Sequence, residues 1–242
     1  MRAKADFSVC VFSSEREVAF CGHATIAIMY DLISNDISLQ TRQLLSIETR
    51  TDLLQIENRY PDEKCVYISA PSPKFSKRII NADEIAIALK CDVGDIGKTK
   101  PIQIINAGLE TLVVPMAGLS NILSISPDIY ILKQFCLNID VDIILLYSSE
   151  VANKDCQYRT RVFAPTFGYL EDPATGSGNS AFGYYLQANK FWTDDKIRIE
   201  QNAFFDSPNF VKLIAKKSGS NETRIWFGGG AKVKIDGHYI LD

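Results

Sequence analysis

The sequence is poor in the residues that build metal centres, disulfide scaffolds and membrane spans. Only two of its 242 residues are histidines, and its six cysteines are widely spaced without a C-x-x-C pair, so the ligand spacing of a structural zinc site is missing. No apolar run approaches the length of a membrane span, and the N-terminus lacks an apolar secretory stretch. We expect free thiols in a reducing, cytoplasmic compartment, with no metal and no membrane partner.

The chain also lacks an excess of charge of either sign. Its formal net charge is −3, and 46% of its residues are hydrophobic while 23% are charged, which is typical of an ordinary globular protein. Such a balance gives no electrostatic argument for a nucleic-acid partner. No G-x-x-x-x-G-K-[ST] phosphate loop occurs. We therefore expect a small molecule as the partner.

Short strand patterns, separated by Gly, Asn and Asp, alternate with a few helical patterns. Strands are predicted over residues 5–13, 16–20, 37–42, 44–50, 53–59, 65–70, 102–108, 110–116, 141–148, 196–202, 210–217, 223–229 and 232–237. Helices are predicted over residues 24–34, 81–90, 126–138 and, after the glycine turn, 181–187. The helix over residues 24–34 is apolar nearly all round, which predicts burial on every side.

A strand, a glycine turn and an apolar helix occur twice. "CGHATIAIMYDL" (21–32) aligns with "TGSGNSAFGYYL" (175–186) at a constant offset, which places Gly22 on Gly176. Chance identities are the alternative explanation. Taken as a repeat, the pattern predicts an α+β fold of two similar lobes, residues 1–105 and 106–242, each a curved, mostly antiparallel sheet around a buried helix. The last strand is a candidate to return to the first lobe, and both helix N-termini should face one cleft.

The first repeat places a histidine at the start of its predicted helix. His23 directly follows Gly22, where a histidine is often a cap or a core residue satisfied by a backbone carbonyl. The repeat favours a functional role, because Ser177 occupies the equivalent position of the second unit. Cys21 has the position of a reactive thiol at a helix N-terminus. Its equivalent is Thr175, not a second cysteine, so we interpret Cys21 as a buried spectator.

The second repeat opens with "EDPATGSGNS" (171–180), in which two carboxylates precede a glycine turn. Such a turn offers free N–H groups and a positive helix end to an anion. Asp172 is a candidate general acid or base, or alternatively a turn residue before proline. Glu171 is expected at the surface or in the turn. "GSGNSA" (176–181) also fits the dinucleotide fingerprint, but "EDPAT" is no central parallel strand, so a nicotinamide oxidoreductase is only a distant third hypothesis.

Four segments carry a resemblance to a known family. "EVAFCGHATIA", "INAGLETLVVPM", "EDPATGSGNSA" and "WFGGGAKVKIDG" occur in this order, and the chain resembles the phenazine biosynthesis PhzF-like isomerases and epimerases, which share the diaminopimelate epimerase fold. The resemblance implies a homodimer and cofactor-independent acid–base chemistry on a carboxylated substrate. It implies catalytic roles for His23, Asp172 and Ser177. The residues that it implies for substrate binding lie in the two turns: Gly22, Thr175, Gly176 and Gly178.

The sequence departs from the family pattern at its N-terminal end. The family's principal acid–base residue is a Glu in an "NLSET"-like segment, which has no counterpart in these 242 residues. Glu15 and Glu17 precede or begin a predicted strand, and we assign the role to neither. Two hypotheses follow. The protein is a PhzF-like isomerase, or it is a non-catalytic binding protein that kept the cleft and lost the base.

Overall fold

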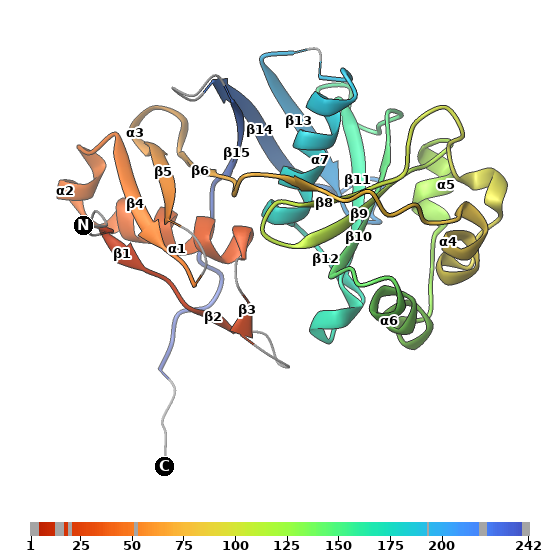
Figure 1. Ribbon diagram of the computed structural model, residues 1–242. Helices are drawn as coiled ribbons and strands as arrows, with labels where there is room; N and C mark the ends of the chain where they lie inside the picture. Colours follow the sequence, from red (N-terminus) through yellow and green to blue (C-terminus); the bar gives the residue numbers. More distant parts are fainter. Residues whose placement is uncertain are drawn as a thin grey trace.

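One long mixed sheet runs through the molecule in the computed structural model, which describes residues 5–12, 17–18, 21–50, 53–192, 194–217 and 222–238. The strand order is β1-β4-β5-β6-β15-β14-β13-β11-β10-β9-β8-β7, with β12 paired to β11, and β2 and β3 form a separate two-stranded antiparallel sheet (Figure 1). Helices pack on this sheet, so the predicted α+β class is confirmed. The predicted division into two lobes at residue 105 stays a prediction.

The elements have the following bounds. The strands are β1 (Phe7–Ser8), β2 (Val11–Phe12), β3 (Glu17–Val18), β4 (Leu44–Glu48), β5 (Leu53–Arg59), β6 (Cys65–Ser69), β7 (Lys74–Phe75), β8 (Gln103–Asn106), β9 (Glu110–Pro115), β10 (Ile143–Ser148), β11 (Tyr158–Phe163), β12 (Glu171–Asp172), β13 (Lys196–Gln201), β14 (Asn209–Lys217) and β15 (Thr223–Gly229). The helices are α1 (Gly22–Asn35), α2 (Ile37–Gln40), α3 (Tyr60–Glu63), α4 (Ala82–Leu89), α5 (Leu119–Ser124), α6 (Ile129–Asn138) and α7 (Gly176–Ala188).

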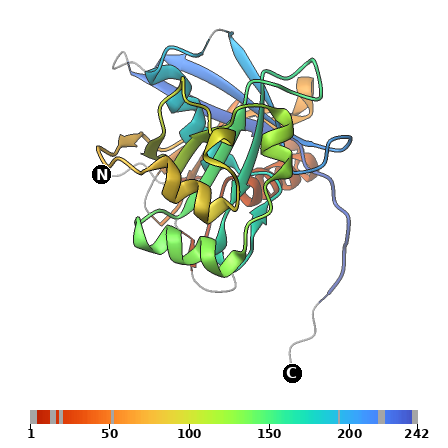
Figure 2. The ribbon, with the colours of Figure 1, turned by 90° about the vertical axis from the view of Figure 1, so that its right-hand side faces the viewer.

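Most neighbouring strands are antiparallel, as the meander and hairpin patterns predicted. The pairs β1/β4, β9/β10 and β11/β13 are parallel. Helices α4 and α6 begin at the side-chain caps Asn81 and Asp128, which accept from backbone N–H groups of the first turn. Together with α5 they cover the outer face of β8 to β10 (Figure 2). Helices α4 and α6, the β8–β9 hairpin and the buried strand β10 match the sequence prediction, whereas α5 was not predicted.

Helix α7 is enclosed on nearly all sides. Eleven of its 13 residues are buried, and it packs against β8, β9, β10, β14 and β15. Its Phe182 ring lies 4.6 Å from the ring of Tyr147 on β10. An all-round apolar helix is stable only in such surroundings.

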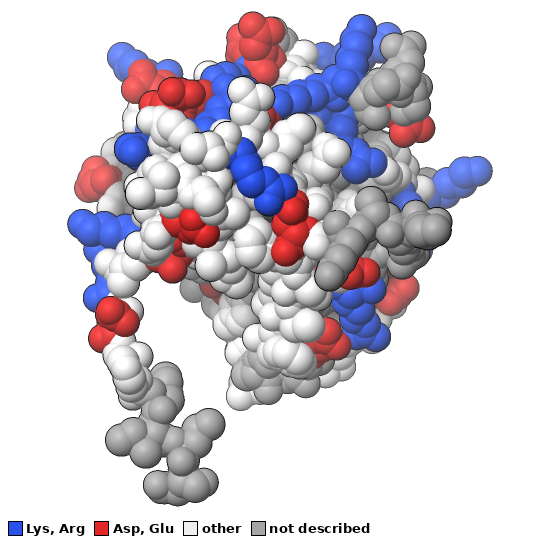
Figure 3. Space-filling model, turned by 90° about the vertical axis from the view of Figure 1, so that its left-hand side faces the viewer, with Lys and Arg blue, Asp and Glu red and all other residues white. Residues whose placement is uncertain are grey.

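Helix α1 is covered on one face only, so the prediction that it is buried on every side is wrong. Its four buried residues include Met29 and Ile33, whereas Ile28 and Leu32 are 41% and 37% exposed. The helix packs against β6, α2, α3 and α7. Figure 3 views the molecule from the side of these elements and shows charges of both signs interspersed with uncharged surface.

Three predicted strands differ from the structure. Residues 37–42 were expected to be extended, but α2 begins at residue 37 because the Asp36 carboxylate accepts from the N–H of Ser38 and caps it. The segment 5–13 divides into β1 and β2, and residue 13 lies outside the described residues. The segment 232–237 forms no strand, and Val233 and Ile235 remain 65% and 91% exposed. Alternation alone does not make a strand, because a strand needs a neighbour for its hydrogen bonds.

The N-terminal turns of α1 and α7 approach each other at two glycines. A Cβ atom on Gly176 would lie 2.5 Å from a ring carbon of Phe227 and 2.8 Å from the Cα of Gly22. Real Cβ atoms do not approach other atoms so closely, so any side chain here would push the two helix ends apart. The two glycines of the predicted repeat therefore meet because neither carries a side chain.

The substitution Gly176→Ala is expected to lower the free energy of unfolding by about 1–3 kcal/mol, the usual range for overpacking a dense core. Urea denaturation at constant m-value measures this. Gly229→Ala is the matched control, because a Cβ atom at Gly229 meets nothing within 4 Å. Equal midpoints for the two variants would contradict the close packing of α1 on α7.

Candidate active site

A cavity of about 300 Å³ lies where the N-termini of α1 and α7 meet. Both helix starts face it, as the repeat predicted. The polar part of its wall comes from the two glycine turns and the "EDPAT" segment, and the remainder is apolar. Its lining residues are Val11, Phe12, Cys21, Gly22, His23, Ala24, Leu109, Ile143, Ala164, Phe167, Tyr169, Asp172, Pro173, Thr175 and Ser177.

Both helix N-termini are without a side-chain cap. Neither Cys21 before α1 nor Thr175 before α7 makes a capping hydrogen bond. The first N–H groups of a helix have no partner inside the helix, and its N-terminal end carries a partial positive charge. Two such ends at one cavity favour a bound anion, such as a carboxylate.

His23 and Asp172 form a pair across the cavity wall. The Nδ1 atom of His23, in the first turn of α1, lies 3.6 Å from Oδ1 of Asp172, on β12. The Asp172 side chain is buried at 6% exposure, and that of His23 is 46% exposed. Asp172 also accepts from the N–H of Ala174 across Pro173. Asp172 therefore makes the predicted turn contact and also lines the cavity, and its role as a general acid or base stays a prediction.

The surroundings of His23 favour its charged form. Contact with the Cys21 thiol, whose Sγ lies 3.8 Å from a ring nitrogen, is the largest influence and raises the pKa of His23. The Asp172 carboxylate raises it further, while burial opposes both, and the resulting pKa is about 9. At neutral pH His23 is thus an imidazolium. Cys21 itself is half-buried and lines the cavity, so its predicted burial is wrong, and its spectator role stays a prediction.

The predicted residues of the second turn divide into two groups. Ser177 is buried at the cavity wall, and its hydroxyl has no hydrogen-bond partner among the described residues. The Thr175 hydroxyl accepts from Gln201 and serves the turn itself. Gly176 lies at the helix crossing, and Gly178 faces Ile143 inside α7. Neither Gly176 nor Gly178 is part of the described cavity wall, so their roles in substrate binding stay predictions.

Glu171 points away from Asp172, because neighbouring residues of a strand face opposite sides. Its carboxylate accepts two hydrogen bonds from Arg161, at 3.0 and 2.8 Å. Arg161 is buried and also donates to the carbonyls of Ile122 and Ile125. Glu171 is therefore half-buried in a structural ion pair, not at the surface as expected, and it lies outside the cavity.

Gln201 organises the "EDPAT" turn from beneath. Its side chain is fully buried. The Gln201 Nε2 donates to the carbonyl of Asp172 at 2.7 Å and to the Thr175 hydroxyl at 3.2 Å. Its Oε1 accepts from the N–H of Thr175 at 3.1 Å and from Asn179 Nδ2 at 2.7 Å. No sequence motif pointed to Gln201, because it lies 26 residues beyond Thr175 in chain order. Only the pairing of β13 with β11 brings it under the turn.

Replacing Gln201 by leucine is expected to cost roughly 2–5 kcal/mol of unfolding free energy, since several buried donors and acceptors each lose a partner. Gln201→Glu keeps the acceptor but puts an oxygen where Nε2 donates to the Asp172 carbonyl, so it should also destabilise the protein. Chemical denaturation measures both variants, and the similarly extended Gln55→Leu on β5, whose side chain is exposed, is the control. Equal stability of the Gln201 and Gln55 variants would contradict the role of Gln201.

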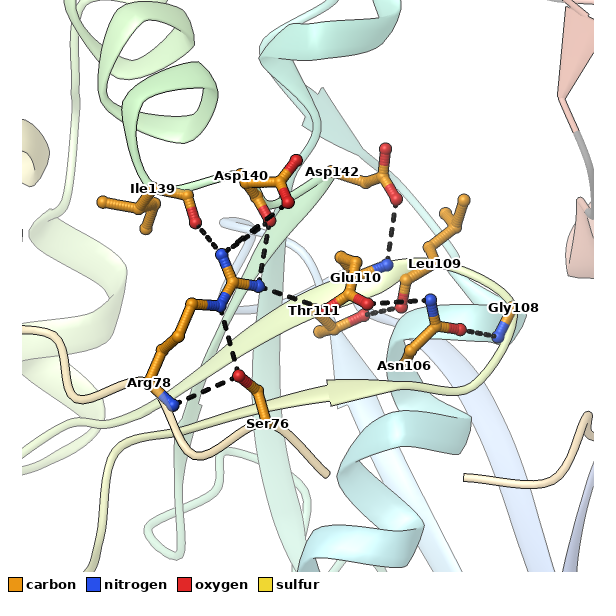
Figure 4. Close-up of polar contacts among 10 residues, drawn as sticks. All are labelled: Ser76, Arg78, Asn106, Gly108, Leu109, Glu110, Thr111, Ile139, Asp140 and Asp142. Atoms are coloured by element: carbon orange, nitrogen blue, oxygen red, sulfur yellow. Dashed lines mark hydrogen bonds and ion pairs between the residues drawn. The ribbon is translucent and has the colours of Figure 1, made fainter. Parts of the chain in front are cut away.

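A second support holds Leu109 over the cavity (Figure 4). The β8–β9 turn is closed by Gly108 N–H donating to Asn106 and by Glu110 N–H donating to Asp142. Arg78 clasps the same region, since its guanidinium donates to the carbonyl of Asp140 at 3.1 Å and lies 3.5 Å from Glu110. The "INAGLE" segment therefore contributes a rigid apolar edge to the cavity.

Two further features bear on the kind of site. In the described ranges, no group of three or more His, Cys, Asp and Glu side chains is arranged to hold a metal ion. None of the described helices combines the length and the apolar character that crossing a membrane requires.

Comparisons with known proteins identify the family of the chain. The family model of phenazine biosynthesis-like proteins (PhzC-PhzF) matches residues 1–237. The chain belongs to this family.

Among its relatives, Antisense-enhancing sequence 1 of Schizosaccharomyces pombe is 26% identical, over 98% of this chain and 81% of that protein. The uncharacterized isomerase YfhB of Bacillus subtilis is 25% identical, over 90% of this chain and 74% of that protein. A crystal structure of the PhzF-family protein of Bacillus anthracis superimposes with a TM-score of 0.79 at 22% identity, covering 92% and 77% of the two chains. The names of YfhB and of a further relative from Clostridium acetobutylicum, both uncharacterized isomerases, are consistent with an isomerase.

Proposed function

We propose that this protein is an isomerase that moves a proton at a carbon atom of a small carboxylated substrate, without a cofactor. The observation that carries the proposal is the His23–Asp172 pair, 3.6 Å apart in a cavity that two uncapped helix N-termini share. The isomerase names of the relatives support the reaction class. Their names give no substrate for this chain.

The two helix ends would bind the substrate carboxylate. The N–H groups that follow Cys21 and Thr175 supply donors, and the Ser177 hydroxyl adds another. Donors arranged in advance around a developing negative charge lower the barrier of proton abstraction next to a carboxylate. The apolar residues of the cavity would exclude water from the reacting carbon.

The proton transfer would use the two titratable groups in opposite roles. The Asp172 carboxylate takes a proton from the substrate carbon, and the His23 imidazolium gives its proton to the same or a neighbouring carbon. Asp172 then holds a proton that His23 lacks. Transfer of that proton across the pair restores both groups, so no oxidant, metal or second substrate is consumed. The two roles require that Asp172 is ionised and His23 is protonated at the same pH.

Exchange with heavy water tests the proposal. The protein is incubated in D₂O with a broad panel of amino acids and hydroxy acids, and mass spectrometry measures deuterium in recovered substrate and product. We expect deuterium at one carbon of at least one compound, with His23→Gln abolishing the uptake. Ligand binding without any exchange would overturn the isomerase and support the binding-protein hypothesis instead.

A further inference from the structure

A second cavity, of about 390 Å³, lies at the carboxyl ends of the parallel neighbours β9 and β10. Pro115 and Met116 at the end of β9 and Tyr147 and Ser149 at the end of β10 line it. The candidate active site lies at the opposite ends of the same strands, near Leu109 and Ile143. The crevice beyond the carboxyl ends of parallel strands is a common place for a ligand.

Backbone hydrogen bonds fix the walls of this second cavity. The loop that follows the short 3₁₀ turn Val93–Asp95 is tied to the end of β9, because the N–H of Gly97 donates to Pro115 at 2.9 Å. The N–H of Ala117 donates to Asp95 at 2.7 Å, and that of Met116 donates to Tyr147 at 2.8 Å. The cavity is therefore formed before any ligand arrives, as small-molecule sites usually are.

Two lysines line the cavity without a counter-ion. Neither Lys98 nor Lys100 has a carboxylate within ion-pair distance in the described part of the chain. Lys100 is half-buried, with its Nζ 5.4 Å from the ring of Tyr147 and 5.5 Å from that of Phe191. Partial burial lowers the pKa of Lys100. The two rings are cation–π partners of Lys100 but carry no net negative charge, so the half-buried ammonium group can still gain a counter-ion from a bound anion.

The nearby carboxylates are already engaged elsewhere. Asp95 accepts from Asn121 Nδ2 at 2.6 Å, and Glu150 accepts from the N–H of Leu119 at 2.9 Å. Neither lines the cavity. Arg159, which is buried more deeply than Lys100, does have a counter-ion, because its Nη1 lies 3.3 Å from Oε1 of Glu200.

We infer that this second cavity is a binding site for a small dianion, of the phosphate monoester class, separate from the candidate active site. The half-buried Lys100 and the exposed Lys98 together supply two positive charges for two negative charges, whereas a single carboxylate would use only one of them. The hydroxyls of Thr99 and Ser149 add hydrogen-bond donors, and the side chains of Ile96 and Met116 provide an apolar wall for the organic part. The inference does not depend on the proposed isomerase activity.

Titration of the full chain with phenyl phosphate tests the inference, with isothermal calorimetry for affinity and ¹⁵N NMR for location. At low ionic strength we expect amide shifts in residues 94–100 and 147–149. Lys100→Met should weaken binding roughly tenfold or more, the scale of one charge-assisted hydrogen bond, and Lys98→Met somewhat less. Lys100→Arg should retain binding. Lys74→Met, on exposed edge strand β7, is the control for loss of one positive charge.

Several results of this titration would overturn the proposed dianion site. Amide shifts at His23 and Asp172 in place of the lysine loop, or unchanged affinity in a folded Lys100→Met variant, would overturn the inference. Absence of binding by the wild-type protein would overturn it as well. Two control ligands are run in parallel. The dicarboxylate 2-methylsuccinate shows whether the site takes any dianion or prefers a phosphate, and the monoanion benzoate shows whether the aromatic ring alone accounts for binding. Binding of benzoate as tight as that of phenyl phosphate would contradict the dianion class.

Discussion

Asp172→Asn is expected to reduce deuterium exchange roughly 100-fold to 10,000-fold, the range for removing a positioned general acid or base. Asparagine has nearly the same shape and can still accept from the N–H of Ala174, the contact that Asp172 makes at 3.1 Å. It cannot take a proton from carbon. The loss should therefore be in kcat, with a small change in KM, and exchange rates of substrate hydrogen by NMR or mass spectrometry measure it.

The control for Asp172→Asn is Asp206→Asn, which removes an exposed carboxylate in the loop between β13 and β14. Its exchange rate should equal that of the unmodified protein. Circular dichroism establishes that both variants are folded. Full exchange activity in a folded Asp172→Asn variant would remove Asp172 from the mechanism, and the His23–Asp172 pair would then be a structural contact.

The second large effect is expected in the titration of His23. An NMR titration should show a midpoint near pH 9, against an ordinary value of 6.5. Cys21→Ser should lower the midpoint most, because the Cys21 contact is the largest influence, and Asp172→Asn should lower it by a smaller amount. The chain has only one other histidine, His238, so His238→Gln leaves a single resonance to assign.

The same shift has a consequence for stability. A folded-state pKa above the unfolded value means that the folded protein binds the proton more tightly. The contribution of His23 to stability is therefore complete below about pH 6.5 and is lost as the pH rises through about 9. His23→Gln should remove this part of the pH dependence between those values. A His23 titration midpoint near 6.5 that Cys21→Ser leaves unchanged would contradict the influence of Cys21 on His23.

Short-range pattern was enough for the elements whose signals are local. Helices α4 and α6 start at the caps Asn81 and Asp128, and β10 is a continuous apolar run. A cap or an apolar run acts within a few residues, so it is visible in sequence order. The strand prediction for residues 37–42 was wrong because the cap Asp36 starts a helix there and outweighs their strand-like composition.

The site was only partly visible in the same way. The two glycine turns, with His23 and Asp172 beside them, were found because each motif is contiguous and the repeat relates one to the other. Gln201 and the Arg78 clasp were not found, because their partners lie in other strands and loops. The contact of Cys21 with His23 depends on rotamers that spacing does not determine.

The sequence by itself determined the α+β class, the family resemblance and the two turns that hold His23 and Asp172. Those features depend on composition, periodicity and contiguous motifs, which involve residues close together in the chain and can be recognised without the structure. Only the tertiary structure decided that α7 is enclosed while α1 is covered on one face, and that His23 touches both Cys21 and Asp172. Burial and pKa depend on atoms brought together from distant parts of the chain, and their positions are set by sheet pairing and packing.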